Sequence, residues 1–213
     1  DVCSRCSAET GVTFEDDFPL IGKAMLTTNM PCNASEATSM FQRRRIGLPD
    51  FPITMAMIHN EPGAHPYSTQ VLKDAIAFIE KHTGEKWNWD YYFECAKRVN
   101  YATECRLGWL EMNKTNYPQV FGSNLALYTE TNYMAICGKV PAFEKADRDI
   151  TRLAERAYKK KKRMAKEYRH RAIVWGVQSH FYFDFLLWLL NCWGIVPLTD
   201  MLSMVSTRTL ATD

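Results

Sequence analysis

The sequence predicts an α/β protein made of two Rossmann-like parallel-sheet units that are joined by a helical section. A strand–helix–strand pattern occurs over residues 23–58 and again over residues 171–198, and amphipathic helical stretches fill the chain between them. A helix that connects two neighbouring strands implies parallel pairing with a right-handed crossover. We therefore expect residues 1–66 to end a first α/β domain, 67–170 to form the helical connection and 171–213 to begin a second α/β domain.

The first domain is expected to contain a short helix followed by a strand–helix–strand unit. The predicted elements are a helix over 2–12, a strand over 23–28, a helix over 35–45 and a buried strand over 51–58. The cations of Arg43–Arg45 suit the negative end of the second helix, and Gly47 and Pro49 end it. His59–Pro66 is predicted to be a loop at the carboxyl end of the second strand, where open α/β sheets bind ligands.

Helical spacing of apolar residues dominates the middle of the chain. Apolar residues between Val71 and Ile79 predict a helix that Gly84 ends, and further helical stretches are expected over 88–113, 122–138 and 143–169. The last stretch carries the basic run Lys159–Arg163, which is typical of a solvated helix face. The alternative for this run is a patch that binds the phosphates of a nucleotide-like ligand.

The second domain repeats the pattern of the first. The predicted elements are a strand over 171–176, a loop over 177–180, a helix over 181–192 and a strand over 195–198. Gly194 is expected to stop the helix.

Composition places the 213-residue chain among ordinary globular proteins. Hydrophobic residues make up 46% and charged residues 23%, and a formal net charge of +2 gives no global sign of nucleic-acid or membrane binding. The longest apolar stretch, Phe181–Trp193, is too short to span a bilayer. Seven dispersed cysteines, without a signal peptide, favour a reduced, cytoplasmic protein. The glycosylation triplets at Asn33 and Asn113 are attributed to chance.

Cys32 is the most informative candidate site residue. It lies between the strand 23–28 and a helix predicted to open at Ser35, and the positive end of a helix favours a thiolate. Cys3 lies beside the first predicted helix, so the two cysteines suggest a metal or iron–sulfur site. Cys3 and Cys6 form a C-x-x-C pair, but no second close Cys/His pair supplies the four ligands of a zinc site, and the role of Cys6 stays open.

Histidines on loops after strands are candidates for substrate contact or proton transfer. His59, His65 and His180 occupy such positions. The cysteines within helical patterns are expected to pack in the core as small apolar residues; these are Cys95, Cys105, Cys137 and Cys192. The sequence contains no P-loop, dinucleotide fingerprint, hydrolase nucleophile elbow or HExxH zinc-protease motif.

Four stretches carry a family resemblance. Asp1–Ser4 has a D-x-C pattern, Asn29–Asn33 places a cysteine after a strand, Tyr67–Gly84 leads into the aromatic-rich helix Trp89–Trp109, and Arg171–Asp200 opens the second domain. In this order they resemble the cluster-binding subunits of the 2-hydroxyacyl-CoA dehydratase and benzoyl-CoA reductase family.

The resemblance implies a [4Fe–4S] cluster held by three cysteines, with Cys3 and Cys32 as the first two ligands. The third family cysteine comes later than these residues, and the chain, which starts at Asp1 and stops without a closing element, is expected to be part of a longer protein. The resemblance further implies a paralogous second subunit in a heterodimer, an ATP-dependent iron–sulfur activator protein and an acyl-CoA substrate. In such dehydratases a low-potential electron turns the thioester into a ketyl radical, which expels the hydroxyl group.

Within that chemistry, His59, followed by Asn60, is expected to move a proton, and Ser179 or His180 to hydrogen-bond an acyl oxygen. The leading prediction is a lyase of the 2-hydroxyacyl-CoA dehydratase type. One alternative is an aromatic, benzoyl-type acyl-CoA reductase subunit. Another is a non-catalytic partner subunit or a double-cubane redox protein of the same family.

Overall fold

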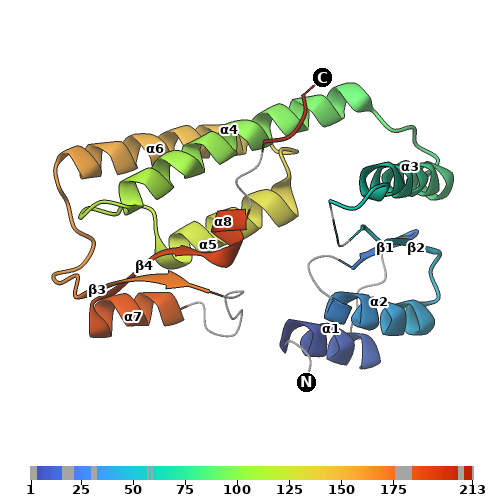
Figure 1. The fold of residues 1–213 in the computed structure, drawn as a ribbon, viewed down its shortest axis with the longest axis horizontal. Coiled ribbons are helices and arrows are strands. Elements are labelled where there is room, and N and C mark those ends of the chain that lie inside the picture. The colour runs from blue at the N-terminus through green and yellow to red at the C-terminus, as the bar shows by residue number, and fades with distance from the viewer. Residues whose placement is uncertain are drawn as a thin grey trace. The chain divides into compact units, whose positions relative to one another are not determined.

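The computed structural model describes residues 4–15, 22–29, 33–56, 58, 60–175, 184–205 and 209–212. The chain combines α-helices with parallel β-sheet, as predicted, and divides into two compact units, Asp1–Trp87 and Asn88–Asp213 (Figure 1). The first long helix, Ala64–Thr83, belongs to the amino-terminal unit. The predicted domain boundaries at residues 66 and 170 remain predictions.

The first unit contains a parallel strand–helix–strand arrangement with one helix before it and one after it. Its elements are α1 (Ser4–Phe14), β1 (Met25–Thr28), α2 (Asn33–Ile46), β2 (Asp50–Ile53) and α3 (Ala64–Thr83). β1 and β2 pair in parallel from Met25 opposite Asp50 to Thr28 opposite Ile53. The predicted parallel pairing is therefore confirmed, although β2 ends at Ile53 and not at residue 58.

Local sequence explains the ends of the helices in this unit. The last turn of α2 carries Arg43–Arg45, and Gly47 follows with a φ of 71°. Arg43 Nη1 also lies 3.1 Å from Asp50 Oδ2, which joins the end of α2 to the start of β2. At the end of α3, Gly84 adopts the left-handed conformation and its N–H donates to the Glu80 carbonyl, as its predicted capping role requires.

The predicted loop His59–Pro66 is wrong at its end. Ala64, His65 and Pro66 form the first turn of α3, which begins well before the predicted apolar face. Proline is tolerated in a first turn because the N–H groups there have no intrahelical partner. His65 is exposed in this turn.

The second unit packs a helical layer against a second parallel strand pair. Its elements are α4 (Trp89–Asn113), α5 (Gly122–Glu130), the π-helix η1 (Thr131–Ile136), α6 (Ala142–Lys159), β3 (His170–Val174), α7 (Phe185–Trp193), β4 (Ile195–Asp200) and α8 (Met201–Val205). β3 and β4 pair in parallel from His170 opposite Ile195, with a shift in register between Ala172 and Ile173. Gly194 ends α7 in the left-handed conformation, as predicted.

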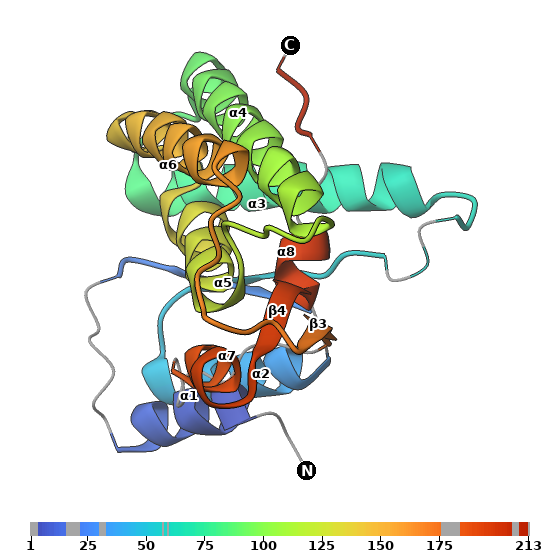
Figure 2. The ribbon, with the colours of Figure 1, turned by 90° about the vertical axis from the view of Figure 1, so that its left-hand side faces the viewer.

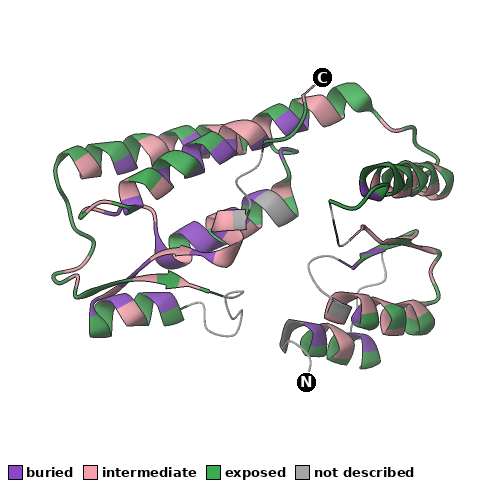
Figure 3. Ribbon diagram, in the orientation of Figure 1, coloured by how far each residue is buried: buried purple, intermediate pink, exposed green. Residues whose placement is uncertain are grey.

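The core of the second unit forms where α4, α5 and α6 meet. Figure 2 shows α4 and α6 side by side, and Figure 3 shows buried residues along α4 and α5. Trp109 and Leu125 are completely buried, and Cys105 and Ala154 pack with them. The Trp109 indole donates to Thr151 Oγ1 at 3.0 Å, so its polar atom is satisfied within the core.

Two predicted helices of this unit differ from the structure. The stretch 122–138 divides into α5 and η1, and Cys137 follows with a φ of 47°. The stretch 143–169 ends at Lys159, because the run of like charges that follows favours a turn, in which Lys161 has a φ of 51°. The basic run is exposed, as predicted, but most of it lies outside the helix.

The predicted burial of the helical cysteines is correct for two of them and wrong for the other two. Cys95 and Cys105 are buried, whereas Cys137 and Cys192 are exposed. Cys137 lies at the end of η1, where the chain turns, and Cys192 lies on a different face of α7 from the buried Leu186 and Leu190. A helical pattern alone does not tell which of its faces is covered.

The triplet at Asn113 fits the predicted chance match. Asn113 is 2% exposed, and its amide nitrogen donates to the carbonyls of Val120 at 2.6 Å and Leu198 at 2.9 Å. Among the described helices, none combines the length and apolarity needed to cross a membrane.

Candidate functional site

The residues predicted to bind the cluster or act on the substrate lie outside the residues that the structure describes. These are Cys3, Cys32, His59, Ser179 and His180. The structure neither brings these residues together nor separates them, and their roles remain predictions. The further candidate His65 is described and lies exposed in the first turn of α3. The structure also describes the elements that carry the adjoining residues.

The helices α1 and α2 begin at the residues that follow Cys3 and Cys32 in the sequence. They pack against each other, and Gln42 Nε2 of α2 donates to Thr13 Oγ1 of α1 at 3.3 Å. Each of these two residues lies nine positions after the first residue of its helix, Ser4 or Asn33, and Figure 1 shows the two helices running in the same direction. Their amino-terminal ends therefore lie at the same end of the pair.

A cavity lies beside the two helices. It has a volume of about 340 Å³ and is lined by Glu9 of α1, by Ser39, Gln42 and Ile46 of α2, and by residues of β1.

Asn29 fixes the carboxyl edge of the first sheet. It is 5% exposed and directly follows β1. Its Nδ2 donates to the Met55 carbonyl at 3.0 Å, and its Oδ1 accepts from the Met55 N–H at 3.1 Å. This paired hydrogen bond replaces the next step of the strand ladder and holds the ends of β1 and β2 together beyond Thr28.

A second polar contact joins this edge to α3. The Ala56 N–H donates to Ser68 Oγ at 3.3 Å, which links the segment after β2 to the first turns of the helix. Asn60 lies in an exposed turn between them. The side chains of Asn29 and Ser68 thus organise the carboxyl edge of the first sheet, and in the sequence they lie on either side of Cys32 and His59.

Asn29 lies in the segment Asn29–Asn33, but no role was predicted for it. Its position at the end of a short apolar strand, shortly before a cysteine, could have indicated a structural role. A buried amide there needs hydrogen-bond partners for both its oxygen and its nitrogen.

The carboxyl edge of the second sheet carries a polar cluster whose groups satisfy one another. Asp200 Oδ1 accepts from the Ser203 N–H at 3.0 Å, and Oδ2 accepts from Ser203 Oγ at 2.6 Å. The Ser203 hydroxyl also lies 3.0 Å from Thr129 Oγ1 of α5. All three residues are buried, so this cluster caps α8 and attaches it to α5.

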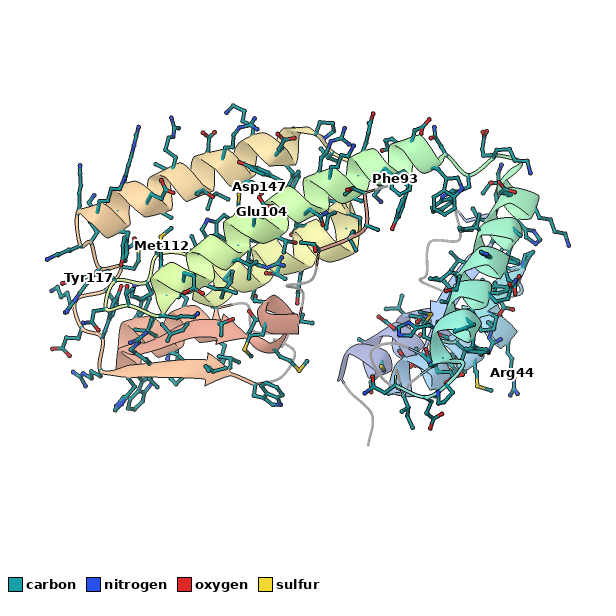
Figure 4. The ribbon with its side chains drawn as sticks, turned by 45° about the horizontal axis from the view of Figure 1, so that its top comes forward. Arg44, Phe93, Glu104, Met112, Tyr117 and Asp147 are labelled. Atoms are coloured by element: carbon teal, nitrogen blue, oxygen red, sulfur yellow. The ribbon has the colours of Figure 1, made fainter. Side chains whose placement is uncertain are left out.

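Another buried polar group lies between α5 and α6. The Tyr128 hydroxyl donates to Asp147 Oδ1 and accepts from Asn132 Nδ2 at 2.8 Å. Burial, followed by the hydrogen bond to Asp147, raises the pKa of Tyr128 far above its ordinary range. Burial also raises the pKa of Asp147, against the lowering effect of the Tyr128 hydrogen bond. Figure 4 marks Asp147 on α6, which packs beside α4.

The start of the chain contains cysteines, which are the kind of residue that binds an iron–sulfur cluster. Cysteine thiolates hold such clusters. Cys6, on the first turn of α1, is 6% exposed, and Cys3 precedes the same helix in the sequence. Within the described ranges, no group of three or more His, Cys, Asp or Glu side chains is placed to hold a metal ion. The predicted ligands Cys3 and Cys32 lie outside those ranges.

A sequence model of the family described as 2-hydroxyglutaryl-CoA dehydratase, D-component, matches residues 1–212. The chain belongs to this D-component family. The match spans both units and confirms the resemblance inferred from the cysteine segments and the aromatic helix. A D-component of an acyl-CoA dehydratase implies an acyl-CoA substrate and a partner component. No curated protein matches the chain.

Proposed function

We propose that this D-component is a subunit of a radical-type 2-hydroxyacyl-CoA dehydratase, with Cys3 and Cys32 as ligands of a [4Fe–4S] cluster. The structural observation that supports the cluster is the common direction of α1 and α2, which begin directly after these two cysteines in the sequence. Family membership supports the dehydratase chemistry. The family resemblance implies a third cysteine ligand, which is not assigned to any residue.

When bound, the cluster would supply an iron that polarises a hydroxyl or carbonyl oxygen and that accepts and donates single electrons. The chain's own residues have separate tasks. Asn29 holds the ends of β1 and β2 together next to the second cysteine segment. His59 moves a proton, and Ser179 or His180 holds an acyl oxygen by hydrogen bonding.

The proposed assembly contains a paralogous second subunit and an ATP-dependent iron–sulfur activator that delivers the electron. In this proposal, each parallel strand pair belongs to a Rossmann-like sheet. A pair of strands alone is marginally stable, and parallel sheets are normally larger and covered by helices on both faces.

The cluster is tested by anaerobic reconstitution of the full chain with iron and sulfide. Cys3→Ser and Cys32→Ser should each lower the bound iron and change the electron paramagnetic resonance spectrum, because a hydroxyl is a poorer cluster ligand than a thiolate. Cys192→Ser, at an exposed position on α7, is the matched control and should retain the iron of the parent chain. Iron content unchanged in Cys32→Ser would remove this residue from the ligands.

The reaction is tested with the second subunit, activator and ATP present. A 2-hydroxyacyl-CoA should lose water, and His180→Ala should reduce turnover. Turnover of benzoyl-CoA without turnover of any 2-hydroxyacyl-CoA would replace the dehydratase with the aromatic reductase.

A further inference from the structure

A cavity in the second unit lies between the start of α5 and the face of α7. Its volume is about 300 Å³, which is at the lower end of the range for small-molecule sites. Phe121, Leu187 and Leu190 contribute apolar surface to it, and Asn124 and Asn191 contribute side-chain amides. Among the described residues that line it, the one charged side chain is the exposed carboxylate of Asp184.

The two amides are available to a ligand. Asn124 and Asn191 are exposed at the cavity and have no hydrogen-bond partner within the described part of the chain. Each offers a donor and an acceptor between apolar neighbours. Such a lining suits a flexible molecule in which amide groups alternate with apolar segments, because both kinds of group find a matching surface.

The basic run Lys159–Arg163 is fixed to the wall of the same cavity. Gln119, a lining residue that is 7% exposed, donates from Nε2 to the Lys162 carbonyl at 3.0 Å. The next lining residue, Met164, donates its N–H to the Tyr168 hydroxyl at 2.6 Å. These bonds hold the carboxyl-terminal end of the basic run beside the cavity.

Aromatic contacts place the last cation of the run. The Arg163 guanidinium lies 5.9 Å from the ring centre of Tyr117 and 5.6 Å from that of Tyr168. Tyr168 packs edge-on against Phe121, which lines the cavity, with 6.4 Å between ring centres. Figure 4 marks Tyr117 in the segment that leads from α4 to α5. Positive charge is therefore concentrated at one side of an otherwise almost uncharged cavity.

We propose that this cavity binds the coenzyme A portion of the substrate, with the pantetheine arm between α5 and α7 and the phosphates at Lys160–Arg163. The proposal rests on the proposed function, which makes an acyl-CoA the substrate. The pantetheine arm carries two amides between apolar segments, and the phosphates at its far end match the lysines and the arginine. The thioester would then leave the cavity at the end opposite the basic turn.

The test measures binding of free CoA to the full chain by titration calorimetry, with pantetheine and ADP as separate probes. Lys160→Glu with Lys162→Glu should weaken CoA at least tenfold and leave pantetheine unchanged, since it removes only the phosphate contacts. Leu187→Trp, which fills the cavity, should weaken both CoA and pantetheine at least tenfold. CoA binding by the parent chain should also weaken as salt is raised.

Matched controls separate these effects from general ones. Lys97→Glu with Lys139→Glu makes the same charge change at exposed positions that do not line the cavity, and Leu153→Trp adds the same bulk at an exposed position of α6. Both should bind CoA as the parent chain does. Circular dichroism and thermal unfolding of each variant verify that it is folded.

Two outcomes would overturn the site: CoA affinity that is unchanged in Leu187→Trp, or ADP binding as tightly as CoA while pantetheine does not bind. Failure of the site is distinct from failure of the function. If the assembled enzyme dehydrates its substrate but CoA affinity is unchanged in both cavity variants, the binding site is refuted and the function stands. If CoA binds as expected but no 2-hydroxyacyl-CoA is dehydrated, the function is refuted and the binding site stands.

Discussion

Gly138 packs directly against the backbone of Cys95, so that a Cβ atom at this position would overlap the Cys95 carbonyl oxygen. The contact joins the segment after η1 to the first turns of α4. Arg98 Nη1 reinforces it by donating to the Gly138 carbonyl at 3.1 Å. The φ of Gly138 is 73°, a conformation that side chains with a Cβ rarely adopt.

Gly138→Ala should therefore destabilise the protein by about 2–5 kcal/mol, from backbone strain together with overpacking. Urea unfolding followed by circular dichroism measures the change. Gly108→Ala is the control, because Gly108 lies within α4 and an added Cβ meets nothing within 4 Å. That substitution should leave stability unchanged or raise it by about 0.5–1 kcal/mol. Equal effects of the two substitutions would contradict the close packing at Gly138.

Asp147→Asn should change how stability depends on pH. Burial raises the pKa of Asp147, so the folded state holds its proton to higher pH than the unfolded chain does. This group's contribution is fully present below the ordinary carboxyl pKa of about 3.9 and is lost as pH rises through the raised value. The asparagine variant should lack this loss, while its amide oxygen still accepts from Tyr128. Urea unfolding between acid and neutral pH measures the slope, with Glu144 and Arg148 as the neighbouring charges.

Asp149 supplies a control of opposite sign on the same helix. Lys145 lowers the pKa of Asp149 by hydrogen bonding, so its contribution is present at neutral pH and is lost as pH falls. Asp149→Asn should remove stability near neutral pH and flatten the acid limb. If both asparagine variants shifted the pH curve in the same direction, the buried environment of Asp147 would be refuted.

Tyr128→Phe should destabilise the second unit by about 1–3 kcal/mol, because it leaves the buried Asp147 carboxyl and the Asn132 amide without their shared partner. The Tyr128→Phe/Asp147→Asn double variant should cost less than the sum of the single changes, since the two residues form one hydrogen bond. Strict additivity in unfolding free energy would count against that bond.

Asn29→Ala should destabilise the first unit by about 2–4 kcal/mol. The change leaves the carbonyl and the N–H of the half-buried Met55 without the amide that they bond to, and that amide belongs to a buried residue. Ser35→Ala, which removes an exposed hydrogen bond of 3.2 Å to the Thr28 carbonyl at the same sheet edge, is the control and should cost less than about 0.5 kcal/mol. Hydrogen exchange of the β1 and β2 amides reports the local effect. Unchanged protection in Asn29→Ala would mean that the amide pair does not hold the strands.

The regular elements were predictable where a local pattern and a stop signal coincide. The strands at Met25 and Ile195, the helix that ends in Arg43–Arg45 and the left-handed caps at Gly84 and Gly194 follow from periodicity, charge and backbone freedom alone. Parallel pairing follows from the strand–helix–strand order.

Burial of polar side chains was not predictable in the same way. Asp147 reads as one more charge on a polar helix, and only the packing of α5 against α6 shows that it is 2% exposed and bound to Tyr128. Cys137 reads as part of an apolar stretch, yet the π-helix before it turns it outward. For Asp147 the partner lies on another helix, and for Cys137 the backbone departs from the 3.6-residue period. Neither feature can be predicted from the local sequence.

The candidate site shows the same limit. The sequence predicts that Cys32 lies between a strand and a helix. The bounds of β1 and α2 agree with this prediction. The amide pair between Asn29 and Met55 joins residues that are 26 positions apart, so the residues around Cys32 do not reveal it.

The two strand pairs have a consequence for how the chain folds. Met25 pairs with Asp50 and His170 with Ile195, so each sheet closes over the same separation of 25 residues. The entropy of closing a loop grows only with the logarithm of its length, and the helix within each loop shortens the search further. Each unit can therefore nucleate its sheet from contacts within its own stretch of chain, and the first sheet can do so before the second unit has been synthesised. The amino-terminal sheet can thus form on the ribosome while the carboxyl-terminal one is still inside the exit tunnel.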